Sequence, residues 1–344
     1  MREPGASLIA GAPSLPKNDA TPEAATRAER TTVEFGVNLP IFGDDPAPVI
    51  ETAVIAEQLG YANVWMGDHI VQPIVQESIY PYSRQDQRGI GEMLSYMDVF
   101  VGMTAVAMKT SRIRVGTSVL IVPYRNPVHT ARLLATVDTF SGGRLDVGCG
   151  VGWSAEEFAA LGVPFANRGG RTNEYLDIYR KLWTEEPVSY HGKFYEFEQV
   201  SFKPKPVQAG GPPIWIGGNS DAAMKRAVTH GAGWQPINLS LEQMTAAKAR
   251  LNELCIEHGR APESLRIILN RGVLLYEEER PPRPADPERP YAAFVGGPQA
   301  MIEEAKQYAD LGVEQIHCHF VARDQAGKHA VMERFMDTVA PLVR

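Results

Sequence analysis

The sequence predicts an α/β fold, a (β/α)8 TIM barrel with insertions, and three observations support this prediction. Strand-like and helical runs alternate from residue 32 to the end of the chain. The alternation repeats eight times, and such a pattern implies parallel strands joined by right-handed crossovers. The 344 residues are 44% apolar and 22% charged, which is enough to form a large core. A doubly wound sheet is the alternative architecture.

The predicted strands are short runs rich in Val, Ile and Leu that end at turn residues. The first strand stops at Pro40, and the fourth breaks at Gly150. In chain order the eight predicted strands are Val33–Leu39, Ala62–Met66, Arg112–Ile121, Arg144–Cys149, Pro213–Ile216, Gly233–Pro236, Leu265–Leu275 and Gln315–Val321.

Helical spacing of apolar residues predicts a helix after each strand. Gly60 ends the first helix and Gly142-Gly143 the third, where glycine supplies the left-handed conformation of a helix C-terminus. We interpret these glycines as structural, because helix-to-strand turns lie on the barrel face opposite the chemistry. The predicted helices are Val49–Leu59, Met97–Met108, Val128–Phe140, Arg171–Trp183, Asp221–His230, Leu241–His258, Ala300–Leu311 and Ala330–Leu342.

Composition argues against several classes of protein. The formal net charge is −7 and no basic stripe is present, so a nucleic-acid binder is not expected. No apolar run reaches the roughly 18 residues needed to cross a bilayer, so a membrane protein is not expected either. The cysteines Cys149, Cys255 and Cys318 are too far apart for a disulfide framework or a zinc site. We therefore expect a reducing, cytoplasmic location.

The first stretch of the chain differs from the rest. Residues 1–31 are rich in Ala, Pro, Glu and Arg and show no hydrophobic period. They lack the basic and continuous apolar segments of a secretory signal. We expect a flexible N-terminal extension over residues 1–31 and a single barrel domain over residues 32–344.

Catalytic residues of such barrels lie just after the strands, and the first candidate is Asp68-His69 after the second strand. Histidine titrates near neutrality and can exchange a proton with a reacting group. Asp68 would orient His69 or cap the following turn. A histidine satisfied by the backbone at a strand end is the alternative.

Two glycine-rich segments follow later strands. In Gly148–Trp153 every second residue up to Gly152 is glycine, which leaves no side chain between the backbone and a flat ligand. A tight turn is the alternative, and the spacing does not fit a dinucleotide-binding fingerprint. Gly217-Gly218-Asn219 leads from a strand into a helix whose free N–H groups suit a phosphate. An ordinary turn with a capped helix is the alternative there.

Two further segments carry side chains of interest. His317 and His319 lie two apart in the last strand and therefore share a face. A metal site is conceivable, but acidic ligands are not evident nearby, so we favour packing. Residues 71–93 form a long insertion after the second strand, and loops of this length in a barrel are usually functional. The insertion carries side chains that would cover an apolar ligand, namely Ile74, Val75, Ile79, Tyr80 and Tyr82.

Several segments, taken in order, resemble the bacterial luciferase-like superfamily of flavin and deazaflavin oxidoreductases. No single segment is specific, but together they span the chain from about Val33 to Arg344. The matching segments are Val64–Ile70, Arg112–Leu120, Asn126–Thr136, Ser141–Trp153, Tyr190–Phe197 and Pro212–Asn219, followed by Gly233-Trp234. The subgroup labelled F420-dependent is most similar, through Tyr80–Ser83, Gly162–Arg168 and Trp183.

The resemblance implies a barrel, commonly a homodimer, with the cofactor ring at the C-terminal mouth. It implies that His69 is an acid/base or anion stabiliser, with Asp68 beside it. It also implies a non-prolyl cis peptide between Ser118 and Val119, behind the ring. The residues expected at the cofactor are Ser118, Val119, Gly150, Val151, Gly152, Trp153, Gly217, Gly218 and Asn219. Those expected at the substrate are Tyr80, Tyr82 and Trp234.

One departure from the family pattern bears on the substrate. Deazaflavin-dependent sugar-phosphate dehydrogenases carry a glutamate where Trp153 stands, so a more apolar small-molecule substrate is expected here. The resemblance implies hydride transfer between coenzyme F420 and an organic substrate. The alternative is a two-component monooxygenase that uses O2 and FMN supplied reduced by a separate reductase. A metal-dependent barrel hydrolase and a non-catalytic flavin-binding barrel are more distant alternatives.

Overall fold

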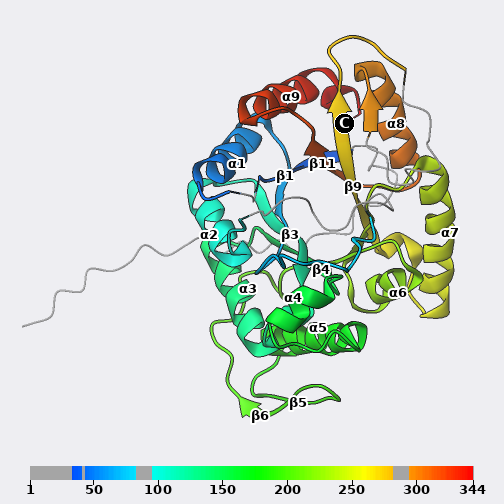
Figure 1. Ribbon diagram of the computed structural model, residues 1–344. Coiled ribbons are helices and arrows are strands. Elements are labelled where there is room, and N and C mark those ends of the chain that lie inside the picture. Colours follow the sequence, from blue (N-terminus) through cyan, green and yellow to red (C-terminus); the bar gives the residue numbers. More distant parts are fainter. Residues whose placement is uncertain (1–32, 41–42, 83–94, 282–293, 344) are drawn as a thin grey trace, which may run out of the picture. The chain divides into compact units, whose positions relative to one another are not determined.

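Eight parallel strands of the computed structural model form a closed barrel surrounded by helices (Figure 1). The order around the barrel is β9-β11-β1-β2-β3-β4-β7-β8, and pairing of β8 with β9 closes it. The structure describes residues 33–40, 43–82, 95–281 and 294–343. The barrel strands are β1 (Glu34–Asn38), β2 (Asn63–Met66), β3 (Arg114–Ile121), β4 (Leu145–Gly150), β7 (Ile214–Gly217), β8 (Gly233–Gln235), β9 (Arg266–Leu275) and β11 (Gln315–Phe320). The predicted barrel is confirmed, and the doubly wound alternative is wrong.

The helices that follow these strands lie near their predicted positions. Gly60 and Gly142 end two of them with φ of 83° and 66°, the left-handed conformation expected there. The last helix begins five residues earlier than predicted because the carboxylate of Asp324 caps it by accepting the Gly327 N–H at 2.7 Å. The helices are α1 (Ala47–Leu59), α2 (Val99–Lys109), α3 (Pro127–Ser141), α5 (Arg168–Thr184), α6 (Asp221–His230), α7 (Leu241–Glu257), α8 (Pro298–Asp310) and α9 (Gln325–Thr338).

Among the α-helices and strands of the described residues, four short elements were not predicted. The helix α4 (Ala155–Ala160) follows β4, and the strand β10 (Phe294–Gly296) adds to the barrel beside β9. The strands β5 (Val188–His191) and β6 (Glu196–Val200) form an antiparallel hairpin outside the barrel wall (Figure 1). Each is too short to show a clear hydrophobic period.

A polar network ties together the strands at the N-terminal end of the barrel. Asn63 donates to Asp146 at 2.6 Å, and the guanidinium of Arg114 pairs with the same carboxylate at 2.8 Å. The Gln315 side chain donates to the side-chain oxygen Oδ1 of Asn63 at 2.6 Å, so β2, β3, β4 and β11 are cross-linked there. The network lies where the strands begin, and the candidate functional site lies at the opposite, C-terminal end of the barrel.

The predicted pair of histidines lies on β11 inside the barrel. His317 is fully buried and stacks on Trp65 with ring centroids 5.4 Å apart, and the rings of His317 and His319 lie 4.9 Å apart. Burial, with a smaller contribution from the charge of Lys328, lowers the pKa of His319 to about 4. Among the described residues, no three His, Cys, Asp or Glu side chains gather in a way that could hold a metal.

Within the described residues, no helix is long and apolar enough to span a membrane. The extension expected over residues 1–31 lies outside the described residues, as does the end of the insertion after Tyr82.

Candidate active site

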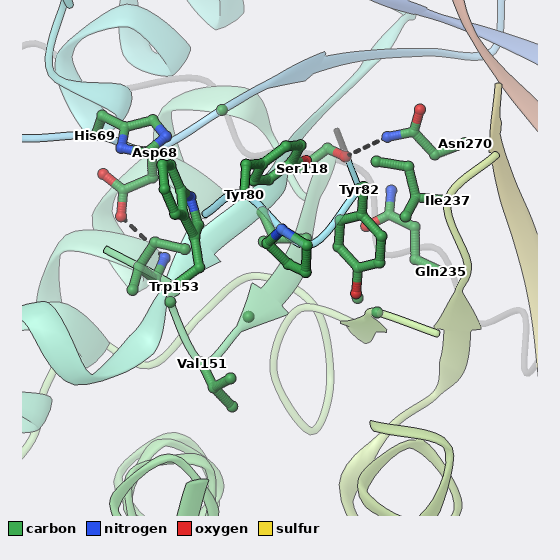
Figure 2. Close-up of a pocket in the computed structure, with 18 residues that line it drawn as sticks. Asp68, His69, Tyr80, Tyr82, Ser118, Val151, Trp153, Gln235, Ile237 and Asn270 are labelled. Carbon is green, nitrogen blue, oxygen red and sulfur yellow. Dashed lines mark hydrogen bonds between the residues drawn. The ribbon is translucent and has the colours of Figure 1, made fainter. Parts of the chain in front are cut away.

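A cavity of about 190 Å³ opens at the C-terminal mouth of the barrel (Figure 2). Its walls come from the ends of β3, β4, β7 and β8, from the middle of β9, and from the loop after β2. Most of the surface is apolar, glycine backbone or aromatic. The lining residues are Gly67, Asp68, His69, Tyr80, Pro81, Tyr82, Ser118, Val119, Ile121, Gly150, Val151, Gly152, Trp153, Gly217, Gly218, Gln235, Ile237 and Asn270.

The imidazole of His69 is held by a buried carboxylate. Its Nδ1 lies 2.9 Å from Oε2 of Glu157, a residue of α4 that is 1% exposed. Glu157 also accepts the hydroxyl of Tyr124 at 2.8 Å and the N–H of Ile70 at 2.8 Å. Burial raises the pKa of Glu157, but these hydrogen bonds and the nearby His69 outweigh it and hold the pKa below its ordinary value. The carboxylate is therefore ionised and accepts the Nδ1 proton, which leaves Nε2 of His69 for a ligand.

Asp68 does not orient His69, contrary to one of the roles expected for it. Its carboxylate forms two hydrogen bonds with the guanidinium of Arg125, at 2.7 and 2.8 Å, and accepts the Ile121 N–H at 3.0 Å. Asp68 and His69 both follow β2, but their side chains bind different partners, Arg125 and Glu157. Asp68 therefore connects the end of β2 to the end of β3, where it also forms part of the cavity wall.

The end of β3 carries the expected irregularity. The peptide bond between Ser118 and Val119 is cis, as predicted, and the pairing of β3 with β4 shifts register between Thr117 and Leu120. The Ser118 hydroxyl accepts the side-chain N–H of Asn270 at 3.3 Å. The bulge places Val119 in the wall of the cavity.

Two of the glycines expected at the cofactor line the cavity and also make room for Val119. A Cβ on Gly150 would lie 2.5 Å from Cγ2 of Val119, and a Cβ on Gly217 would lie 2.6 Å from Cγ1. Gly152 has φ of +80° and packs closely against Phe158. The alternating glycines therefore leave room for the protein's own side chains, and they would also leave room for a flat ligand.

Aromatic rings form one side of the cavity. Trp153 packs edge-to-face against Tyr80 and His69, with centroids 5.3 and 6.3 Å away. Tyr80 in turn packs against Tyr82 at 5.5 Å. Figure 2 shows His69 and Trp153 on one side of the cavity and Gln235 and Asn270 on the other.

The turn that was predicted to bind a phosphate is present, but the hydroxyl of Tyr82 accepts one of its backbone N–H groups. Gly218 has φ of +115°, and the N–H of Asn219 donates to the hydroxyl of Tyr82 at 3.1 Å. The Asn219 side chain does not line the cavity and exchanges two hydrogen bonds of 2.9 Å with the backbone of Ile237. Trp234, expected at the substrate, is fully buried and does not line the cavity; its indole N–H donates to the Gly218 carbonyl at 2.8 Å.

The loop from Ile70 to Tyr82 covers one side of the site and is anchored on α4. The Glu156 carboxylate accepts the N–H groups of Glu77 and Ser78 at 2.8 and 2.9 Å. The loop also exposes large apolar side chains, including Ile74 at 87% and Val75 at 74%.

The site residues that sequence reasoning missed include Glu157 and Gln235. Glu157 lies three residues after Ser154, and this Ser-x-x-Glu spacing is typical of a helix cap. The Ser154 hydroxyl does accept the Glu157 N–H at 3.2 Å, but the carboxylate points to His69. Gln235 falls in a predicted strand, where only its polarity at a buried position could have marked it.

A family model for luciferase-like monooxygenases matches residues 30–339. An uncharacterised protein of Mycobacterium tuberculosis is 31% identical over 220 residues, which cover 64% of this chain and 75% of that protein. An FMNH2-dependent dimethylsulfone monooxygenase of Pseudomonas putida is 31% identical over 182 residues, or 52% of this chain and 49% of that protein. The structure of an F420-dependent secondary alcohol dehydrogenase superposes with a TM-score of 0.73 at 17% identity, covering 91% of this chain and 99% of that one.

Proposed function

The chain belongs to the luciferase-like monooxygenase family, and from this premise we propose that it transfers a hydride between coenzyme F420 and a small, fairly apolar organic substrate. His69 serves as the acid/base at the substrate. The observation that carries the proposal is the pair formed by His69 and the buried Glu157, 2.9 Å apart at the edge of the cavity.

The pair is suited to proton exchange at a substrate oxygen. Glu157 fixes the proton on Nδ1 of His69, so that Nε2 is the atom that takes or returns a proton. When His69 becomes cationic, the adjacent buried carboxylate stabilises the charge. Asp68 is already neutralised by Arg125 and takes no part in this exchange.

The residues around the cavity fit a flat redox cofactor. Such a cofactor supplies a carbon or nitrogen that accepts or donates a hydride when it is bound. Val119 and Ser118 would support one face of the ring, and Trp153 would flank it. The Gly218 N–H already donates to the backbone carbonyl of Gln235 at 3.3 Å, so the turn after β7 would receive the phosphate through the N–H of Asn219, which now donates to Tyr82.

The apolar walls favour a substrate without a charged group. Among the described residues that line the cavity, Asp68 and His69 are the ionisable side chains other than tyrosines, and Asp68 is paired. The described lining contains no Lys or Arg side chain that would pair with an anionic substrate.

An FMN-dependent monooxygenase is the second candidate. The similarity to the Pseudomonas putida enzyme named for FMNH2 favours it. In that case the protein would need reduced FMN from a separate reductase and would consume O2. His69 would keep its role as a proton donor or acceptor.

The two candidates are separated by binding and oxygen measurements. Equilibrium titrations with oxidised and reduced F420 and FMN identify the cofactor, and an oxygen electrode records O2 uptake during turnover. Hydride transfer with F420 predicts tight F420 binding and no O2 uptake. O2 uptake with reduced FMN that is coupled to oxygenation of a substrate, beyond the uptake recorded without the protein, supports the second candidate, and binding of neither cofactor overturns both.

A further inference from the structure

The floor of the cavity contains a side chain whose hydrogen-bonding groups have no partner. Gln235 is 2% exposed and lines the cavity at the end of β8. Within the part of the chain that the structure describes, neither its amide nitrogen nor its carbonyl oxygen forms a hydrogen bond. An unsatisfied buried polar group costs about 1–3 kcal/mol, so a side chain kept in this state points to a ligand.

The surroundings of Gln235 leave its carboxamide available. The backbone of β8 is already paired with β7 and β9. The neighbouring Asn270 side chain donates its hydrogen bond to the Ser118 hydroxyl at 3.3 Å. The Gln235 oxygen lies 2.8 Å from the position that a Cβ of Gly148 would take. The absence of a side chain at Gly148 therefore gives the carboxamide its place.

We propose that Gln235 binds the imide edge of the cofactor ring, which makes it a cofactor-binding residue. This inference rests on the proposed function. A carboxamide presents one donor and one acceptor in a single plane. The pyrimidine end of flavins and deazaflavins presents the complementary pattern, a ring N–H between two carbonyl groups. The N–H of the ring would donate to Oε1, and Nε2 would donate to a ring carbonyl.

Other ligands match this side chain less well. A phosphate accepts hydrogen bonds only and would leave the oxygen of Gln235 unsatisfied. An apolar substrate would leave both groups unsatisfied. Because FMN and F420 share the imide edge, the assignment does not depend on which of them binds.

The test compares Gln235→Leu with the wild-type protein and with Gln299→Leu, the same change at an exposed position on α8. We expect Gln235→Leu to weaken FMN or F420 binding by about 10- to 100-fold, the loss of two neutral hydrogen bonds. The ligand-free variant should melt at the same or a higher temperature, because an unsatisfied polar group is replaced by an apolar one. The control should change neither value.

A cofactor analogue methylated on the imide nitrogen gives an independent readout. The wild-type protein should bind it much more weakly than the parent cofactor, and Gln235→Ala, which makes room for the methyl group, should remove most of that difference. Unchanged cofactor affinity in Gln235→Leu, or a lower melting temperature without ligand, overturns the assignment. If the wild-type protein binds neither cofactor, the proposed function itself fails.

Discussion

Nδ1 of His69 and Oε2 of Glu157 lie 2.9 Å apart although 88 positions separate the two residues in the chain. His69 follows β2, whereas Glu157 lies on the short helix after β4, and the closed barrel brings the two strand ends together. Tyr124, which precedes α3, donates to the same carboxylate at 2.8 Å. The position of the imidazole is thus set by three separate parts of the chain: the segment after β2, the residues before α3, and α4.

The first prediction separates catalysis by His69 from its structural role. In His69→Asn the amide N–H can still donate to Glu157, but the side chain no longer exchanges protons. We expect turnover to fall by about 100-fold or more, with the melting temperature and cofactor affinity nearly unchanged. His69→Ala should lose activity equally and also stability, by about 1–3 kcal/mol, because the buried carboxylate loses a partner. Wild-type turnover in the asparagine variant contradicts the role assigned to His69.

The second prediction concerns Tyr82 in the phosphate turn. Its hydroxyl accepts the Asn219 N–H at 3.1 Å, so a phosphate must displace it to reach that group. Tyr82→Phe leaves the N–H free, and we expect the affinity for FMN or F420 to rise by about 2- to 10-fold. Binding of the phosphate-free analogue, riboflavin or the deazaflavin nucleoside, should not change. Tyr80→Phe is the matched control, and an equal effect on both ligands would place the phosphate elsewhere.

The third prediction concerns stability in acid. Glu57 accepts the N–H groups of Arg112 and Ile113 at 2.6 and 2.9 Å, just before β3. Although partial burial raises its pKa, these backbone hydrogen bonds predominate and lower it to about 2. A lowered pKa stabilises the fold above the ordinary pKa near 4.5, and the contribution disappears as the pH falls toward 2. Glu57→Gln should therefore melt at a lower temperature at pH 7, and its difference from wild type should shrink between pH 4.5 and 2. A difference independent of pH would show that the charge is not involved.

The barrel was predictable because its signals are local. Each of the eight strands is an apolar run that ends at a turn residue, and glycines such as Gly60 mark the helix ends with their left-handed conformation. The β5–β6 hairpin was missed because its strands lie outside the barrel, and its exposed residues carry no regular apolar pattern.

The site was only partly predictable because its partners are distant in sequence. His69 could be chosen from its position at a strand end, but its partner Glu157 has the spacing of a helix cap and shows its role only in three dimensions. Trp234 was placed at the substrate, yet it is buried behind the turn, since neighbouring residues of a strand face opposite sides and its neighbour Gln235 lines the cavity.

The last prediction tests how closely the glycines of the barrel mouth fit Val119. A Cβ on Gly150 would lie 2.5 Å from Cγ2 of Val119, and both residues sit in paired strands that cannot easily move apart. Gly150→Ala should therefore lower the free energy of unfolding by about 1–3 kcal/mol, as overpacking does in a close-packed interior.

Val119→Ala removes the methyl group responsible, so adding it to Gly150→Ala should restore part of the loss. Urea unfolding of the two single variants and the double variant forms a thermodynamic cycle, whose coupling energy we expect to be favourable by about 1 kcal/mol or more. Additive effects would mean that Gly150 is required for another reason, such as the approach of a ligand to the backbone of β4.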